Sequence, residues 1–466
     1  MEKKVLGLAC SLAFVFLVLV IPLGGAYAAT FDDLYQLDWA HSDGGAGETE
    51  YTSVVATGDG FVVVGDSSST DGAFWGNNGS FDAVIVKYNL DGTIAWAHNY
   101  GGSGYDVLNS VAIVNDGYIA VGTSESSDAA DWGNYGSRDA LVVKFNLDGT
   151  LAWAKNLGGS GDDEFTSVVP TSDGYMAVGT TSSSNAADWG GHIGGLDTLA
   201  VKLNLDGTVS WAEVDGGPGA DRLASVIAAD DGYIAVGESQ GGAAHWGSAG
   251  GYDAIVIKYG LDGAFLWAYN SDVPGDACFM SVAATGDGFV TSGYRDGGAA
   301  VVARYDQDGT LLWENISAIP IFSVLSSVGV ASDGFIAFGY EDSDLMAAKY
   351  SFDGTLLWET TVGGSDSEEG YEMTLTSDGF VGVGYSFSTD AAEWAYNGSG
   401  VIVKYSLKPQ GGDPNAGGTP LPGIIPDTGD AGAGAVACVM LLVLSAAALA
   451  WLGIKRRNVK SRFKRV

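Results

Sequence analysis

The middle of this 466-residue chain repeats one pattern seven times, and the repetition constrains the fold more than any other feature. Each repeat has an Asp-Gly turn before a Val-rich segment, an apolar segment ending in a basic residue, and a segment carrying tryptophan. The Asp-Gly turns begin at Asp59, Asp116, Asp173, Asp231, Asp287, Asp333 and Asp378. The basic residues are Lys87, Lys144, Lys202, Lys258, Arg304, Lys349 and Lys404. Self-similarity at such a period is typical of architectures that stack one structural unit many times.

The tryptophan segments are displaced at the two ends of the repeat region. Six of these tryptophans follow the other marks of their repeats, at Trp96, Trp153, Trp211, Trp267, Trp313 and Trp358. The seventh, Trp39, precedes every other mark, and the last repeat stops at Lys408 without a tryptophan segment. A closed ring in which the N-terminal segment completes the last unit explains this order. A linear stack has no reason to divide one unit between its two ends.

The residue pattern within a repeat predicts short β-strands. Alternation is visible in Thr93-Ile94-Ala95-Trp96-Ala97-His98. We expect four antiparallel strands per repeat, named a to d, which in the first repeat cover about 52–57, 61–66, 83–89 and 93–100. Two-residue Asp-Gly hairpins should join a to b and c to d, because glycine adopts positive φ easily.

One such sheet leaves its apolar faces exposed, so the sheets must stack against one another. Seven sheets stacked around an axis form a β-propeller. The sequence therefore predicts an all-β, seven-bladed β-propeller at 29–408, with four antiparallel strands per blade. The strand that contains Trp39 should complete the last blade and close the ring.

The repeat also resembles a known family. The segments DAVIVKYNLDGTIAWAHNYGGSGYD and SVAIVNDGYIAVG are similar to the bacterial β-propeller repeat (SBBP) of secreted proteins. This similarity extends over about 34–408. It implies the propeller fold and an exported location, and it assigns no catalytic residue.

The N-terminus predicts export. Lys3 and Lys4 precede an apolar run at 5–23, and Ala26-Tyr27-Ala28 has the small residues of a cleavage site. We therefore interpret 1–28 as a signal peptide, with the mature chain starting near Ala29.

The C-terminal region predicts an anchor. Residues 409–424 are rich in Pro and Gly, as a flexible spacer is. The apolar run 431–454 is long enough for a transmembrane helix. The basic residues of the tail 455–466 should keep that tail in the cytoplasm.

A short motif separates the spacer from the apolar run. It consists of Ile425, Pro426, Asp427, Thr428 and Gly429. The motif, the apolar run and the basic tail together resemble the LPxTG cell-wall sorting signal of Gram-positive surface proteins, with Ile425 in place of the first Leu. This resemblance implies that a sortase cleaves after Thr428 and joins it to peptidoglycan, so that only the C-terminal segment touches the membrane before sorting. The alternative is a plain C-terminal membrane anchor.

The chain is strongly acidic, with 57 Asp and Glu against 21 Lys and Arg. This excess of negative charge argues against nucleic acid and anionic membrane surfaces as partners. Removal of both predicted processing segments leaves Cys278 as the only cysteine, so we expect no intramolecular disulfide.

Two sets of loop residues are candidates for ligand binding. Loops from strand d to the next strand a combine glycine with carboxylates, and these suggest a calcium site because Ca²⁺ takes six to eight oxygen ligands. The candidate calcium ligands are Asp162, Asp163, Glu164, Asp366, Glu368 and Glu369. The strict spacing of an EF-hand loop is absent, and the alternative is solvated turns that keep an exported protein soluble.

The second set lies in long b–c inserts of five repeats. It consists of Trp75, Trp132, Trp189, Trp246 and Trp394. An indole ring beside carboxylates can bind a sugar by stacking on its C–H face. Alternatively, each ring folds inward and fastens its own insert, which repetition at one register favours. Rings that point outward would support binding, and buried rings would support packing.

The repeating basic residue should form a structural ring of cations with Asp59 and Asp91 and their repeats, and the strand-d tryptophans should pack between blades. Catalysis has little support, because the four histidines lack metal-ligand spacing and no serine nucleophile motif occurs. We therefore predict that the chain is not an enzyme. The predicted function is adhesin-like binding of an extracellular glycan, protein or matrix component by a wall-anchored protein, through its acidic loop face. The alternatives are a structural surface-coat component and, third, an exported glycan-active enzyme.

Overall fold

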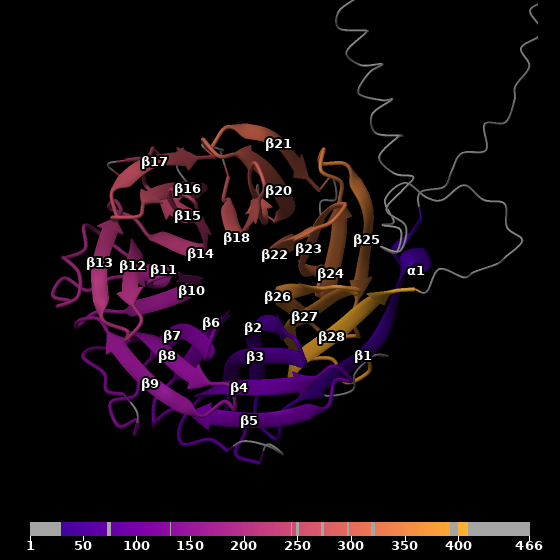
Figure 1. Cartoon of the computed structure of the whole chain (residues 1–466), viewed down its shortest axis with the longest axis horizontal. Helices are drawn as coiled ribbons and strands as arrows, with labels where there is room; N and C mark the ends of the chain where they lie inside the picture. Colours follow the sequence, from indigo (N-terminus) through magenta and orange to yellow (C-terminus); the bar gives the residue numbers. More distant parts are fainter. Residues whose placement is uncertain are drawn as a thin grey trace, which may run out of the picture. The chain divides into compact units, whose positions relative to one another are not determined.

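Seven four-stranded antiparallel sheets surround a central axis in the computed structural model (Figure 1). The structure describes residues 29–71, 76–130, 132–243, 245–247, 251–271, 275–295, 298–317, 322–391 and 399–408. The predicted seven-bladed β-propeller with four strands per blade is confirmed. A short helix, α1 (Phe31–Leu34), precedes the first strand and begins at a capping box formed by Thr30 and Asp33.

Each blade runs outward from an innermost strand a to an outermost strand d. The strands a are β2 (Thr49–Thr57), β6 (Asp106–Val114), β10 (Asp163–Thr171), β14 (Asp221–Ala229), β18 (Cys278–Thr285), β22 (Ser323–Ala331) and β26 (Glu368–Thr376). The strands b are β3 (Gly60–Ser67), β7 (Gly117–Ser124), β11 (Gly174–Thr181), β15 (Gly232–Gln240), β19 (Gly288–Arg295), β23 (Gly334–Glu341) and β27 (Gly379–Ser386). The strands c are β4 (Asp82–Asn89), β8 (Asp139–Asn146), β12 (Asp197–Asn204), β16 (Tyr252–Gly260), β20 (Ala299–Asp306), β24 (Asp344–Tyr350) and β28 (Ser399–Leu407). The strands d are β5 (Ile94–Tyr100), β9 (Leu151–Leu157), β13 (Val209–Asp215), β17 (Phe265–Asn270), β21 (Leu311–Ile316), β25 (Leu356–Val362) and β1 (Tyr35–Asp43).

The ring closes as the sequence predicts. The first strand, β1, pairs antiparallel with the last strand, β28, and Trp39 lies opposite Lys404. The final blade therefore has the order β1-β28-β27-β26, so both ends of the propeller belong to one sheet (Figure 1).

The hairpin turns differ in part from the prediction. In the first a–b turn, Gly58 and Asp59 form the two-residue loop, and Gly60 already pairs with Thr57. The c–d loop has three residues, because Asn89 N–H bonds to Thr93 O across Leu90, Asp91 and Gly92. The prediction of two-residue Asp-Gly loops is therefore wrong for the c–d connection, in which the glycine is the last residue of a three-residue loop.

The glycine of each c–d loop has a steric role between blades. Gly92 has φ +82°, and a Cβ atom there would lie 2.8 Å from the Trp39 ring. Equivalent contacts join Gly149 to Trp96 and Gly354 to Trp313. The strand-d tryptophans therefore pack against the turn of the next blade, as predicted.

The hydrophobic core lies between adjacent blades. One core cluster joins Val62, Val64 and Ile85 of the first blade to Leu108 and Val111 of the second. Strands b and c are buried on both faces, which explains their nearly continuous apolar sequences.

No helix within the described ranges is long and apolar enough to cross a membrane. The predicted signal peptide 1–28 lies outside those ranges. The spacer 409–424, the sorting motif 425–429, the transmembrane segment 431–454 and the basic tail 455–466 lie outside them as well.

Candidate functional site

The two faces of the ring have different loops. One face carries the d–a loops and the b–c inserts, and we call it the insert face. The other carries the a–b and c–d hairpins, and we call it the turn face. The candidate ligand-binding residues that the structure describes belong to the insert face.

The insert tryptophans that the structure describes are buried. Trp132 is 6% exposed, Trp189 is 5% exposed and Trp246 is 6% exposed. Each joins a core cluster between blades. Their rings are not available to stack on a sugar, so the packing alternative applies to these three. Trp75 and Trp394 lie outside the described residues.

A repeating hydrogen-bond chain fixes these rings. Trp132 Nε1 donates to Ser124 Oγ at 2.9 Å, and Ser124 Oγ donates in turn to the Asp106 carboxylate. Blade three repeats the chain with Trp189, Thr181 and Asp163. Blade four repeats it with Trp246, Ser239 and Asp221. Each tryptophan therefore links its insert, through the hydroxyl at the end of strand b, to the aspartate at the start of strand a in the same blade.

Two of the candidate calcium ligands take part in these structural contacts. Asp163 is fully buried and accepts hydrogen bonds from Thr181 Oγ1, Ser183 Oγ and Gly159 N–H. Glu368 is also buried and accepts from Ser386 Oγ at 2.7 Å and from Gly364 N–H at 2.9 Å. Both carboxylates close the d–a loop against strand b.

The other four candidates are more accessible. Glu164 accepts from Asn109 Nδ2 at 2.8 Å, and Glu369 accepts from Tyr371 OH at 2.9 Å. Asp162 and Asp366 are exposed on their loops. Within the described part of the chain, no group of three or more His, Cys, Asp or Glu residues is placed to hold a metal ion.

The repeating basic residues form ion pairs at the turn face. Lys87 Nζ lies 2.6 Å from Asp59, Lys144 lies 2.9 Å from Asp116, and Arg304 lies 2.7 Å from Asp287. These bonds hold the pKa of Asp59 and Asp116 below the usual range, mainly through the lysine hydrogen bond. The c–d aspartate behaves differently, because Asp91 accepts from Thr93 within its own turn. The predicted structural ring of cations is confirmed for the a–b aspartates.

A polar cavity of about 250 Å³ lies on the axis of the ring. Every strand a contains a register shift near its start, and the extra residue lines this cavity. These residues are Thr52, Asn109, Thr166, Ala224, Met280, Ser326 and Tyr371. The bulges therefore give each blade one side chain in the central channel.

A ring of hydrogen bonds joins the blades around this channel. In six blades a serine hydroxyl of strand a accepts the backbone N–H of the next strand a. The serines are Ser53, Ser110, Ser167, Ser225, Ser281 and Ser327. Glu372 takes the seventh place, where its Oε2 accepts from Val54 N–H at 3.2 Å. Burial raises the pKa of Glu372 to about 7.

More carboxylates gather where this channel approaches the insert face. Glu50 of β2 lies directly opposite Asp66 of β3, and Glu369 belongs to the neighbouring β26. Burial, with Glu50 and Glu48 nearby, raises the pKa of Asp66 to about 8. The pKa of Glu50 is raised for the same main reason. We call Glu50, Asp66 and Glu369 the seam acids, because Glu50 and Glu369 belong to the innermost strands of the first and last blades and Asp66 pairs with Glu50.

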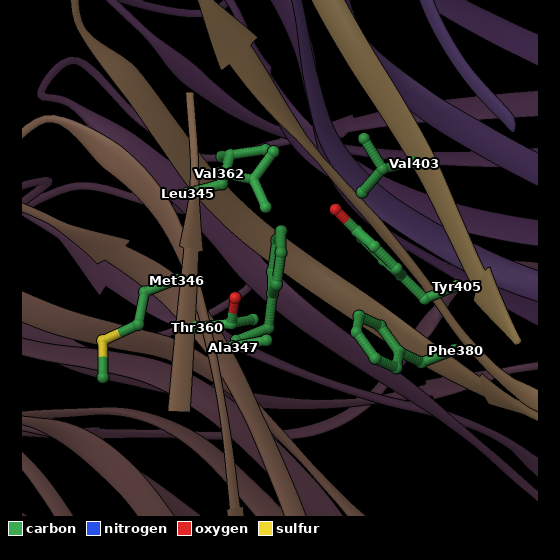
Figure 2. A pocket seen from close by; sticks show the side chains of 9 residues that line it. Leu345, Met346, Ala347, Thr360, Val362, Phe380, Val403 and Tyr405 are labelled. Atoms are coloured by element: carbon green, nitrogen blue, oxygen red, sulfur yellow. The ribbon is translucent and has the colours of Figure 1, made fainter. Parts of the chain in front are cut away.

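A second cavity is part of the core. It lies between the last two blades and is lined by apolar side chains that include Phe380, Val403 and Tyr405 (Figure 2). Its volume of about 10 Å³ is too small for a ligand. The central channel is therefore the better candidate.

The fold and the site define a seven-bladed β-propeller with an acidic central channel. No protein-family model matches the chain. Regulatory protein FlaEY from Caulobacter vibrioides is 26% identical over 144 residues, which are 28% of this chain and 15% of that protein. The chain thus matches a small part of its relative.

Two solved structures are similar to the chain at a low level. Sqt1 from Chaetomium thermophilum is 11% identical, with a TM-score of 0.43 over 75% of this chain and 82% of Sqt1. A Bacteroides uniformis protein predicted to be a 6-phosphogluconolactonase is 13% identical, with a TM-score of 0.40 over 66% of this chain and 82% of that protein. Likeness at this level carries no functional argument, and the strand pairing itself defines the fold.

Sequence reasoning missed Asp66 and Glu372, and it named Glu369 as a candidate calcium ligand. Glu372 replaces a serine of the repeat, and Asp66 stands where the next two blades have Thr123 and Thr180. An alignment of the seven repeats on the Asp-Gly turns would have shown both departures.

Proposed function

We propose that this chain is an exported, wall-anchored surface protein whose propeller binds an extracellular glycan, protein or matrix component through its insert face. The resemblance to SBBP repeats and to the sorting signal at 425–429 supports the location. The observation that carries the binding role is the break in seven-fold repetition at the channel. Packing residues repeat in every blade, whereas Asp66 stands where the next two blades have threonine and Glu372 stands where the other six blades have serine.

Exposed insert residues extend this binding surface. Tyr135 is 72% exposed in the second blade's insert, and Ile193 is 63% exposed in the third. An exposed tyrosine offers apolar contact area and a hydroxyl at small entropic cost. These side chains replace the buried tryptophans as the contacts that we assign to the ligand.

The binding role is tested with the full chain in mild detergent on an array of glycans and matrix proteins, read with calcium and with chelator. Selective, saturable binding that Tyr135→Ala weakens would support the proposal. The matched control is Leu147→Ala, an exposed leucine on the turn face, which should leave binding unchanged. A blank array in both conditions would favour a structural coat component.

The anchor is tested in a Gram-positive host that has a sortase. The wild-type chain should fractionate with the cell wall, and Thr428→Ala should move it to the membrane. Membrane fractionation of both proteins would support the plain membrane anchor.

A further inference from the structure

The ring of serines between the blades places hydroxyl groups along the central cavity. Five of these serine oxygens accept a backbone N–H of the next strand a at 3.2–3.4 Å. Among the described residues, none accepts the hydrogen of these five hydroxyls. They are Ser110, Ser167, Ser225, Ser281 and Ser327, and all five line the cavity. The sixth serine of the ring, Ser53, bonds to Glu372 instead.

Other hydroxyl groups of the cavity lining already have acceptors in the protein. Thr52 and Thr166 donate to backbone carbonyls of the next blade, and Tyr371 donates to Glu369 at 2.9 Å. A serine oxygen that accepts an N–H bond also becomes a better donor, because linked hydrogen bonds polarise one another. The five serine hydroxyls therefore offer donors to whatever fills the cavity.

The cavity has room for a small ligand and extends toward the insert face. Its volume of about 250 Å³ is enough for several water molecules or for one small molecule. Glu50 lines it together with Thr52, and Glu50 lies nearer the insert face because β2 begins there, after a d–a loop. A ligand that the loops of the insert face hold can therefore place its end in the cavity.

The lining of the cavity differs from one side to the other. Ala224 of β14 and Met280 of β18 supply apolar surface. Glu50 of β2 and the pair Tyr371 and Glu372 of β26 supply carboxylates and a phenol ring. Strands β14 and β18 lie across the axis from β2 and β26 (Figure 1). The cavity therefore has an apolar side and a polar side that accepts hydrogen bonds.

The donors and acceptors together fit a neutral ligand with several hydroxyl groups. An anion would suit the five serine donors, but Glu50 and Glu372 in the same lining would repel it. The described residues hold no group of three His, Cys, Asp or Glu that could bind a metal ion. A hydroxyl group, in contrast, accepts from serine and donates to a carboxylate at once. A sugar ring also has a C–H face, which the apolar side of the cavity can remove from water.

We propose that the central cavity binds one pyranose ring, the end of a glycan that the insert face recognises. The five serine hydroxyls donate to its oxygens, and Glu50 and Glu372 accept from its hydroxyl groups. Its C–H face packs against Ala224 and Met280. This inference rests on the proposed function, because it chooses a glycan among the proposed ligands and places its terminal sugar in the channel.

A side chain that fills the cavity tests the site without removing a bond between blades. Ala224 occupies the bulge of the fourth blade, and Tyr371 occupies the equivalent bulge of the last blade. Ala224→Tyr therefore places in one blade a residue that the fold already accepts in another. The matched control is Ala95→Tyr, the same substitution at an exposed position of the outer strand β5. Glu372→Gln is a second variant, which keeps the size of the side chain and removes its charge.

The experiment is a saturation-transfer NMR titration of the full chain in mild detergent. The probes are free glucose, galactose, mannose and N-acetylglucosamine, each added alone. We expect at least one of them to bind saturably, with a dissociation constant of about 1 mM because a single sugar makes few contacts. Ala224→Tyr should weaken this binding by about tenfold or more, and Glu372→Gln by about threefold. Ala95→Tyr should leave it unchanged, and melting temperatures show that each variant is folded.

The inference is overturned if none of the four sugars binds, since the serine hydroxyls then donate only to water. Sugar binding that survives in folded Ala224→Tyr would place the sugar outside the cavity and overturn it as well. If Ala224→Tyr does not fold, unchanged binding by Glu372→Gln has the same meaning. Array binding by a chain that binds none of the free sugars would overturn this inference alone. A blank array beside sugar binding in the cavity would overturn the proposed function alone.

Discussion

Glu372 Oε2 accepts a hydrogen bond from the backbone N–H of Val54 at 3.2 Å, across the boundary between the last blade and the first. Serine makes this contact at the other six boundaries. The closing boundary of the ring therefore places an ionisable side chain in the central channel, where the repeat otherwise places a neutral hydroxyl.

Replacing Glu372 with serine should stabilise the protein. Serine can accept the Val54 bond as its equivalents do, and the substitution removes a carboxylate whose pKa burial raises to about 7. We expect Glu372→Ser to gain about 1 kcal/mol at pH 8, measured by chemical denaturation. Ser327→Ala is the control and should destabilise, since it removes the equivalent bond to Met373. A less stable Glu372→Ser variant would contradict the prediction and point to a further role for the carboxylate in the folded ring.

Stability should fall as the pH rises from 5 to 8. The pKa values of Asp139, Glu372 and Asp66 are raised to about 6, 7 and 8, with burial the largest cause in each case. These groups bind protons more tightly in the folded state, so their stabilising contribution is complete at low pH and is lost as the pH passes each folded pKa.

Thermal melts between pH 4 and pH 8 test this prediction. Below about pH 4 stability should fall again, because turn-face aspartates such as Asp59 have lowered pKa values and lose their ion pairs on protonation. Asp66→Asn together with Glu372→Gln should flatten the slope above pH 5. A melting temperature that rises toward pH 8 would contradict the assignment.

Much of the fold was predictable because each blade repeats the same physical solution. The alternation around Trp96, the basic residue Lys87 and the displaced Trp39 are enough to predict strands, blade number and ring closure. The c–d loop length was not predictable from Asp-Gly alone, because the hydrogen bond between Asn89 and Thr93 decides where the strands end.

The candidate site was less predictable, for a definite physical reason. An aromatic ring beside carboxylates has the same sequence pattern whether it faces solvent or packs inward. Trp132 donates a hydrogen bond to Ser124, and Ser124 donates to the Asp106 carboxylate. These contacts show that the carboxylate helps to hold the buried ring in place. The seam acids depend on pairing between strands and between blades, which local sequence patterns do not reveal.

Removing an insert tryptophan should destabilise the fold. Trp132 fills the core between the first two blades and donates to Ser124, so Trp132→Ala leaves a cavity and removes one of the hydrogen bonds that Ser124 Oγ accepts. We expect a loss of about 3–5 kcal/mol, measured by chemical denaturation. Tyr135→Ala in the same insert is the control, because its side chain is exposed and should contribute less than about 0.5 kcal/mol. Similar stability of the two variants would show that the ring does not fasten the insert.

The turn-face ion pairs should respond unequally to loss of either partner. Lys144 is buried, while its partner Asp116 is largely exposed. Lys144→Met therefore removes a buried charge and leaves a solvated carboxylate, so we expect little change in the free energy of unfolding. Among the described residues, Asp116→Ala leaves the buried ammonium with only the Phe145 carbonyl as acceptor, at 3.1 Å. This loss should be about 1–2 kcal/mol, less than for a fully buried pair because water reaches Asp116.

The double variant completes this comparison. Lys144→Met with Asp116→Ala should be nearly as stable as Lys144→Met alone, because the aspartate has no buried charge left to balance. Chemical denaturation of the three variants at pH 7 and two salt concentrations measures the coupling energy. High salt should reduce that coupling only in part, since the lysine end of the pair is shielded from solvent. Equal losses for both single variants would mean that the ring of cations is an ordinary surface salt-bridge network and does not hold the blades' hairpins in place.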